Sequence, residues 1–259
     1  MISKLLKYKF KYLLNGSKVI IEPGGKFEVE SNVEILNSTL YVGSGGYLKI
    51  TANTKLLDST IYIKGIGCNM QIGSNCSINN IDLSLWSGHF SLGNYSILEN
   101  GSIGRKNRIS VEGTCSIGEY NRIRSGIWVR FAGELSIGNR NAINDFTEIR
   151  CDEKVEIGDY NQISYECVIW DTNTHCIYTP EKRRKLTDSQ YPGFGEETEK
   201  PSTKLVSIGN DCWLGKGVTL LKGSVVGDKC IVAFGTLISG KKIPDNSTVI
   251  SKSTLQVSD

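Results

Sequence analysis

The sequence predicts an all-β parallel solenoid, in which the chain winds in coils around one continuous core. The first observation is a period of six, because branched aliphatic residues recur at this interval at Ile208, Leu214, Leu220, Val226, Val232 and Ile238. The second is that a smaller residue stands two positions before each of them, so both point to the same side of a strand. The third is the glycine that follows three of these aliphatics, at Gly209, Gly215 and Gly227, where the chain would turn a corner. A period of six fits neither a helix nor simple strand alternation, and three hexads make one triangular coil.

A longer repeat extends the solenoid toward the N-terminus. The pairs Ile117-Gly118, Ile137-Gly138 and Ile157-Gly158 are spaced by one coil length, and each is followed by an asparagine at Asn121, Asn141 or Asn161. We expect these asparagines to stack as a structural ladder, each amide bonding to the coils above and below it. Looser repeats reach back to residues 37–42 and 58–63. At about 4.8 Å per coil, roughly ten coils make a prism about 45–50 Å tall.

Four segments follow from this pattern. Residues 1–16 read as an amphipathic helix with lysines between apolar residues, which either caps the open end of the solenoid or lies through residues 2–14 on a membrane surface. Residues 17–250 form the β-helix domain, and 251–259 form a C-terminal tail. The register breaks over 171–204, so we expect an insert there, and a long loop on a rigid scaffold is a frequent place for function.

Composition excludes several classes of protein. A net charge of +3 over 259 residues is too small to indicate a nucleic-acid partner. Five of the eight cysteines, at 76, 115, 167, 212 and 230, occupy the small position before an aliphatic, so we expect buried, reduced thiols. No CxxC pair is present, so no metal site is expected. Free thiols, no apparent signal peptide and no transmembrane run favour the cytoplasm, with peripheral contact to the inner membrane face through residues 2–14 as an option.

The run from Ile208 to Gly215, followed by Val232-Ala-Phe-Gly-Thr236 and Ile243-Pro244, resembles the hexapeptide-repeat acyltransferases. The resemblance is strongest to their sugar and polysaccharide O-acetyltransferase branch. It implies a left-handed parallel β-helix, an exception to the usual right-handed crossover. It also implies a homotrimer, acetyl-CoA as the acyl donor, no metal, and a sugar or polysaccharide acceptor.

The resemblance assigns catalytic roles to three residues. Of only two histidines, His175 lies in the insert within a D-x-x-x-H segment, which is similar to the family's D-x-x-H-type motif, so it is the expected general base; His89 is expected to be a wall residue. A base of this kind is usually oriented by an acceptor on its second nitrogen, and Asp171 is the candidate, with Glu166 or a backbone carbonyl as rivals. Trp213 matches a family tryptophan beside the acceptor and thioester; the alternative is an outward ring packed on the insert.

The donor site is also inferred from the resemblance. The backbone N–H near Lys216 is the expected oxyanion donor, and Ala233, Gly235 and Thr236 would let the pantetheine arm approach the backbone. Lys241 or Lys242 matches a lysine near the CoA phosphates, although the pair could equally be a solvated turn. The tail from Ser251 to Leu255 departs from the family's pattern. The basic run 182–185 is either a solvated loop or a contact for CoA phosphates or an acidic acceptor.

These expectations converge on an O-acetyltransferase that modifies a sugar hydroxyl of a bacterial-type surface polysaccharide or its precursor. One alternative is an N-acyltransferase acting on an amino-sugar nucleotide, although that class often carries a separate N-terminal nucleotide-binding domain. Another is a solenoid scaffold without catalytic activity. A carbonic anhydrase on the same fold needs three histidines, which a chain with only His89 and His175 does not supply.

Overall fold

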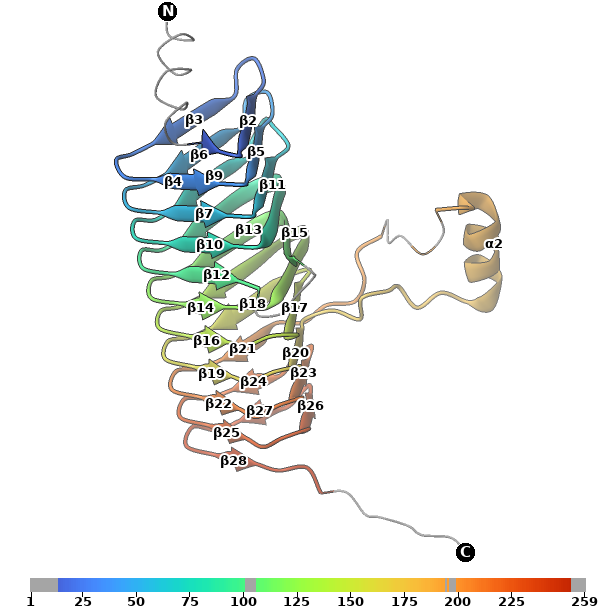
Figure 1. Ribbon diagram of the computed structural model, residues 1–259. Helices are drawn as coiled ribbons and strands as arrows, with labels where there is room; N and C mark the ends of the chain where they lie inside the picture. The colour runs from blue at the N-terminus through green and yellow to red at the C-terminus, as the bar shows by residue number, and fades with distance from the viewer. Residues whose placement is uncertain (1–13, 101–105, 194, 196–198, 253–259) are drawn as a thin grey trace, which may run out of the picture.

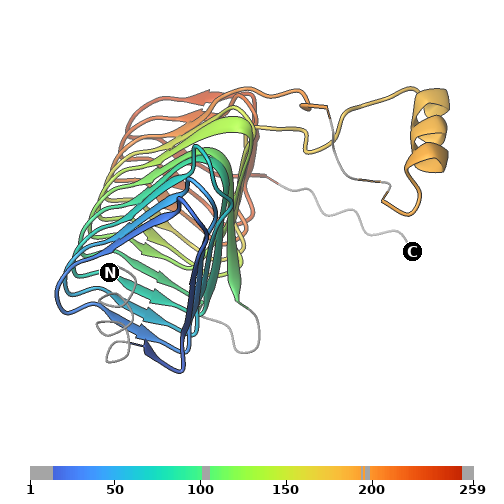
Figure 2. The ribbon, with the colours of Figure 1, turned by 90° about the horizontal axis from the view of Figure 1, so that it is seen from above.

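The chain folds as a parallel β-helix whose coils stack into a triangular prism (Figures 1 and 2). This computed structural model describes residues 14–100, 106–193, 195 and 199–252. The predicted parallel β-helix of about ten coils is confirmed, since one face alone contains 11 strands. Its left-handed winding stays a prediction from the resemblance. The predicted capping helix over residues 1–16 lies outside the described residues as far as residue 13, and Leu14–Asn15 already form strand β1.

Each coil contributes one strand to each of three faces, which we call the first, second and third face in chain order. The first face holds β2 (Lys18–Ile21), β5 (Thr39–Val42), β8 (Thr60–Ile63), β17 (Glu148–Cys151), β20 (Val168–Trp170), β23 (Thr219–Leu221) and β26 (Leu237–Ser239). The second holds β3 (Lys26–Val29), β6 (Tyr47–Ile50), β9 (Asn69–Ile72), β18 (Lys154–Ile157), β21 (Val206–Ile208), β24 (Val225–Val226) and β27 (Lys242–Ile243). Three long strands run around the corner between these faces, namely β11 (Ile81–Leu92), β13 (Asn107–Ile117) and β15 (Gly126–Ile137).

The third face is a separate sheet of 11 strands. In chain order they are β1, β4 (Glu34–Leu36), β7 (Lys55–Leu57), β10 (Ser77–Asn79), β12 (Ile97–Glu99), β14 (Arg122–Ile123), β16 (Ala142–Ile143), β19 (Gln162–Ile163), β22 (Trp213–Leu214), β25 (Ile231–Val232) and β28 (Thr248–Val249).

The core is the stack of inward-pointing aliphatic side chains predicted from the six-residue period. All six aliphatics of the repeat are at most 3% exposed, and each pairs in register with an aliphatic of the coil above. Burial of one such side chain contributes about 1.5–3 kcal/mol. The five cysteines in the small position are also buried. Burial raises the pKa of the Cys115 thiol to about 12 and that of Cys212 to about 11, so these thiols behave as small hydrophobic groups.

The asparagine ladder is confirmed. The Asn121 side-chain oxygen accepts a hydrogen bond from the backbone N–H of Asn141 at 2.9 Å, and the oxygen of Asn141 accepts from the backbone N–H of Asn161 at 2.8 Å. The last oxygen accepts from the N–H of Cys212 at 2.8 Å. The ladder therefore satisfies backbone donors at a tight corner, where an unpaired buried N–H would be costly.

The insert leaves the prism between β20 and β21 and carries the helix α2 (Pro180–Gln190), which stands apart from the solenoid in both views (Figures 1 and 2). Thr179 caps the helix by accepting from the backbone N–H of Lys182 at 3.3 Å, and Pro180 occupies the first turn. No residue of α2 is buried. Of the described helices, none is long and apolar enough to cross a membrane.

Candidate active site at the insert

The insert is closed at its root by a short antiparallel pair. Thr172 bridges Thr203, and the backbone N–H of Asn173 donates to the carbonyl of Ser202 at 3.0 Å. The N–H of Lys204 donates to the carbonyl of Asp171 at 2.8 Å. Both arms of the insert are therefore fixed to one another where they leave the prism, so residues close to the root share the rigidity of the coils.

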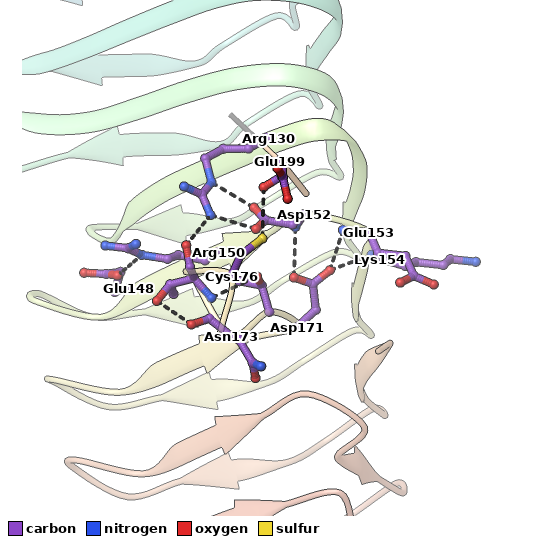
Figure 3. A network of polar contacts seen from close by, with 12 residues as sticks. Arg130, Glu148, Arg150, Asp152, Glu153, Lys154, Asp171, Asn173, Cys176 and Glu199 are labelled. Carbon is purple, nitrogen blue, oxygen red and sulfur yellow. Dashed lines mark hydrogen bonds and ion pairs between the residues drawn. The ribbon is translucent and has the colours of Figure 1, made fainter. Parts of the chain in front are cut away.

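Asp171 lies at this root and is fully buried. One oxygen of its carboxylate accepts from the backbone N–H of Asp152 at 2.8 Å, and the other accepts from the N–H groups of Glu153 and Lys154, both at 2.7 Å (Figure 3). Burial raises the pKa of the Asp171 carboxyl, while the three backbone donors favour its charged form. These contacts bind the root of the insert to the turn of the preceding coil. The role of Asp171 in orienting His175 stays a prediction.

His175 lies four residues after Asp171 and is exposed to solvent. The residue before it, Thr174, is nearly buried at 8% exposure and has a φ of 64°. A β-branched residue in the left-handed region is strained, so the surrounding contacts must hold this turn. The exposed imidazole is thus carried on a fixed backbone turn, and its role as general base stays a prediction.

A charged network that the sequence analysis did not identify contacts this turn from the two preceding coils. Arg130, at the first–second corner, donates from Nε to Oδ1 of Asp152 at 2.9 Å and from Nη2 to Oδ2 at 2.7 Å (Figure 3). The same Nη2 also lies 3.4 Å from the carbonyl oxygen of Thr174. Local sequence gives no signal for this network, because its members come from different coils. Only the register, which places Val129 beside Cys151, brings Arg130 next to Asp152.

Trp213 lies elsewhere, on the third face. The residue is 50% exposed, and its neighbours in the sheet are Gln162 and Ile231. The insert leaves from the corner between the first and second faces. The expectation that Trp213 lies beside acceptor and thioester stays a prediction.

The corner between the third and first faces holds four residues of the expected donor site, Lys216, Ala233, Gly235 and Thr236, and we call it the glycine corner after Gly217 and Gly235. Both glycines have positive φ, 71° and 64°, and a side chain on Gly235 would meet nothing within 4 Å. The ammonium of Lys216 pairs with Glu166 at 3.2 Å. The surface beside Gly235 is therefore open, and a narrow ligand could approach the backbone there.

The two remaining positions at the glycine corner differ in access. Ala233 is partly exposed, whereas Thr236 is 1% exposed and its hydroxyl accepts from the backbone N–H of Ser251 at 3.4 Å. Ala233 thus agrees better than Thr236 with the expected contact for a pantetheine arm.

Lys241 and Lys242 lie on the opposite edge of the first face. They are exposed and stand where β26 leads into β27, at the same corner as the insert. The predicted site residues thus form two groups within one chain. His175, Asp171, Lys241 and Lys242 belong to the insert corner, whereas Trp213, Lys216, Ala233, Gly235 and Thr236 belong to the third face and the glycine corner. At about 3.3 Å per residue, six residues of one face separate the two corners by roughly 20 Å.

The structure offers no evidence for a metal centre within the part of the chain that it describes. No group of three or more His, Cys, Asp or Glu side chains comes together there. The second histidine, His89, is exposed on β11, as expected for a wall residue.

Comparison with known proteins supports the resemblance inferred from the repeat. Residues 206–240 match the family profile described as bacterial transferase hexapeptide (six repeats). A putative lipopolysaccharide biosynthesis O-acetyl transferase of Escherichia coli K12 is 25% identical over 142 residues, covering 53% of this chain and 68% of that protein. A probable acetyltransferase of Mycobacterium tuberculosis is 28% identical over 135 residues, covering 52% of this chain but only 38% of that protein.

Two solved structures are also similar. The polysialic-acid-specific acetyltransferase NeuO is 15% identical with a TM-score of 0.35, covering 89% of this chain and 80% of that one. The polysialic acid O-acetyltransferase OatWY is 17% identical with a TM-score of 0.29, covering 94% and 92%. The resemblance predicted from the sequence is confirmed: residues 206–240 match the hexapeptide-repeat profile, and the chain is similar over 142 residues to a putative O-acetyl transferase.

Proposed function

We propose that this protein is an O-acetyltransferase that moves an acetyl group from acetyl-CoA to a sugar hydroxyl of a surface polysaccharide or its precursor. The observation that carries the proposal is the exposed His175 on a fixed turn at the root of the insert, in a β-helix whose residues 206–240 match the transferase hexapeptide profile. The names of the relatives support the acetyl group and the hydroxyl acceptor.

The reaction requires a general base, a hydrogen-bond donor to the developing oxyanion, and binding sites for both substrates. In the proposed step, His175 removes the proton of the acceptor hydroxyl while the oxygen attacks the thioester carbonyl. The tetrahedral intermediate then collapses, the carbon–sulfur bond breaks, and the proton held by the imidazole passes to the leaving thiolate. The products are the acetyl ester and CoA. The backbone N–H near Lys216 is the proposed donor to the oxyanion.

The glycine corner fits the acyl donor. The open surface beside Gly235 suits a narrow chain such as pantetheine, and Phe234, 73% exposed, flanks it with an apolar ring. Lys216 stands between β22 and Gly217, so its backbone faces the same corner. Lys241 and Lys242 provide positive charge for phosphates at the other edge of the face.

The separation of the two groups suggests that the site forms between copies of the chain. A base at one corner of a prism cannot reach a thioester roughly 20 Å away at the other, since reacting atoms must lie about 3–3.5 Å apart. We therefore propose a homotrimer in which the insert corner of one copy meets the glycine corner of its neighbour. Exposed apolar residues around the glycine corner support this contact, namely Phe146, Trp213, Ile231, Phe234 and Leu237.

The proposed location is the cytoplasm, where acetyl-CoA is made and thiols remain reduced. All eight cysteines are free, and seven of them are buried. Because none of these cysteines forms a disulfide, the fold does not depend on an oxidising compartment.

The function is tested first by calorimetric titration with CoA, which requires no knowledge of the acceptor. We expect about one site per chain.

A panel of sugars and polysaccharides is then screened with acetyl-CoA, and release of the CoA thiol is followed for wild type, His175→Ala and His89→Ala. We expect His175→Ala to lose about 10³-fold in kcat at unchanged CoA affinity, while His89→Ala keeps full activity. Full activity in His175→Ala would overturn the assignment of the base. No binding at millimolar CoA would favour a scaffold or a different acyl donor.

A further inference from the structure

The turn that carries His175 is strained, and the means by which it is held are visible. Thr174 has a φ of 64° and is 8% exposed, so its backbone is fixed in a conformation that a β-branched residue avoids. On its N-terminal side, the N–H of Thr174 donates to Oγ1 of Thr172 at 3.0 Å. On its C-terminal side, the carbonyl that joins it to His175 faces Arg130 Nη2 at 3.4 Å. The peptide that orients the base therefore lies between these two contacts.

Arg130 is itself held with little freedom. It binds Asp152 through two parallel hydrogen bonds of 2.9 and 2.7 Å, and Asp152 is fully buried. A bidentate pair of this kind fixes the plane of the guanidinium, which a lysine ammonium could not do. The backbone N–H of Asp152 in turn donates to Asp171 at 2.8 Å, so the pair is joined to the root of the insert (Figure 3).

The pair is also costly, which indicates that it serves a purpose beyond packing. A fully buried carboxylate such as that of Asp152 loses its hydration, and ion pairs in such places are often no more stabilising than apolar residues of the same size. Elsewhere the first–second corner is built largely from backbone hydrogen bonds and glycines, such as Gly88 and Gly113. Here, instead, the buried carboxylate of Asp152 pairs with the partly exposed Arg130 next to the turn that bears His175.

We infer that Arg130 and Asp152 are positioning residues, which set the direction of the His175 imidazole by fixing the Thr174–His175 peptide. Arg130 comes from the coil of β15, Asp152 follows β17 and Thr174 follows β20, so the pair ties three successive coils to the base. The inference rests on the proposed function of His175, and it adds two residues that sequence resemblance does not indicate.

The direction of His175 can be observed without any assay of activity. The chain has only two histidines, so protein labelled with ¹³C at the histidine Cε1 gives two imidazole resonances, and His89→Gln identifies the one from His175. We expect Arg130→Met to shift and broaden the His175 resonance and to leave that of His89 in place. In the acyl-transfer assay, we expect kcat to fall about 30- to 100-fold, with KM for acetyl-CoA within twofold of wild type.

Two further variants keep the test valid if Arg130→Met folds poorly because Asp152 remains charged and unpaired. Arg130→Met/Asp152→Asn removes both charges and should fold while still losing the His175 resonance position. Arg130→Lys keeps the charge but not the fork, and we expect it to retain the melting temperature with a partial loss of kcat. The matched control is Arg124→Met, because Arg124 is likewise an arginine paired with carboxylates, those of Glu99 at 2.8 Å and Asp145 at 3.4 Å, but away from the insert. It should leave the His175 resonance in place.

The outcomes separate this inference from the proposed function. An unmoved His175 resonance in Arg130→Met and in the double variant would overturn the positioning role, whatever the activity. A moved resonance with unchanged kcat would support the positioning of His175 and overturn His175 as the base. An equal effect of Arg124→Met on the resonance would reduce the result to general destabilisation and also overturn the inference.

Discussion

The solenoid and the insert obey opposite rules although they belong to one chain. In the solenoid, every coil buries aliphatic side chains at positions such as Ile149 and Leu220, both fully buried. In the insert, α2 buries nothing, and its sequence is charged on all sides. A helix without an apolar face gains no stability from packing, and 11 residues are few for a helix on its own. The coils are therefore a rigid scaffold, the insert is an exposed segment that extends away from it, and the polar contacts at the root fix one to the other.

The insert should be cut by trypsin long before the solenoid. The run 182–185 places four cationic residues on exposed helical turns, whereas coil residues such as Lys49 and Arg150 lie on strands that are paired on both sides. We expect cleavage within α2 to be about 100-fold faster than cleavage at strand residues such as Lys49 and Arg150, as followed by gel electrophoresis and mass spectrometry. Cleavage of the coils at a comparable rate would show that the solenoid lacks the expected rigidity.

Truncation of one core side chain should affect stability far more than truncation in α2. Ile149 is fully buried between the coils above and below it, so we expect Ile149→Ala to cost about 3 kcal/mol in the free energy of unfolding. Leu186 lies in α2, where no residue is buried, and Leu186→Ala should cost less than about 0.5 kcal/mol. Urea unfolding followed by circular dichroism measures both variants. A similar cost for the two would contradict the contrast drawn between the regions.

The asparagine ladder permits a test of the polar contacts within the coils. Asn141 is 2% exposed, donates to the side chain of Asn121 at 3.1 Å and accepts from the backbone of Asn161. Asn141→Ala leaves a buried N–H without an acceptor, so we expect a loss of about 2 kcal/mol. The matched control Gln162→Ala removes an exposed amide from the next coil and should have little effect. A neutral Asn141→Ala would mean that water replaces the lost amide at this corner.

The repeat made the fold predictable, whereas much of the site depends on contacts between coils. The period of six set the direction of each core side chain, because any shift would turn aliphatics such as Leu214 outward. It also placed the insert, whose ends break the period. It did not predict α2, although Thr179-Pro180-Glu181 is a helix start signal that could have been recognised. Nor could it place Arg130 beside Asp152, because a pair from different coils becomes visible only when the length of each coil is known.

The same limit explains the assignment of the catalytic groups. The sequence placed His175 and Gly235 in one site by resemblance, and the structure shows them at two corners of one prism. A single chain therefore holds the two proposed parts of the site apart. Light scattering of the purified protein tests the proposed assembly: we expect a mass of three chains, and a monomer would contradict it.

The last and smallest expected effect is a difference in thiol reactivity between the solenoid and the insert. Seven cysteines are buried in the coils, and burial raises the pKa of thiols such as Cys115 and Cys212, to about 12 and about 11. A raised pKa means that almost no thiolate is present at pH 8, and buried thiols are also inaccessible to reagents. Cys176 follows His175 in the insert and is partly exposed.

We therefore expect a maleimide at pH 8 to add once per folded chain, at Cys176, as shown by mass spectrometry, while Cys176→Ser takes up none. Labelling should also slow acyl transfer, because it places a bulky group beside the proposed base. Rapid labelling of Cys115 or Cys212 under these conditions would mean that the coils open far more often than their packing predicts.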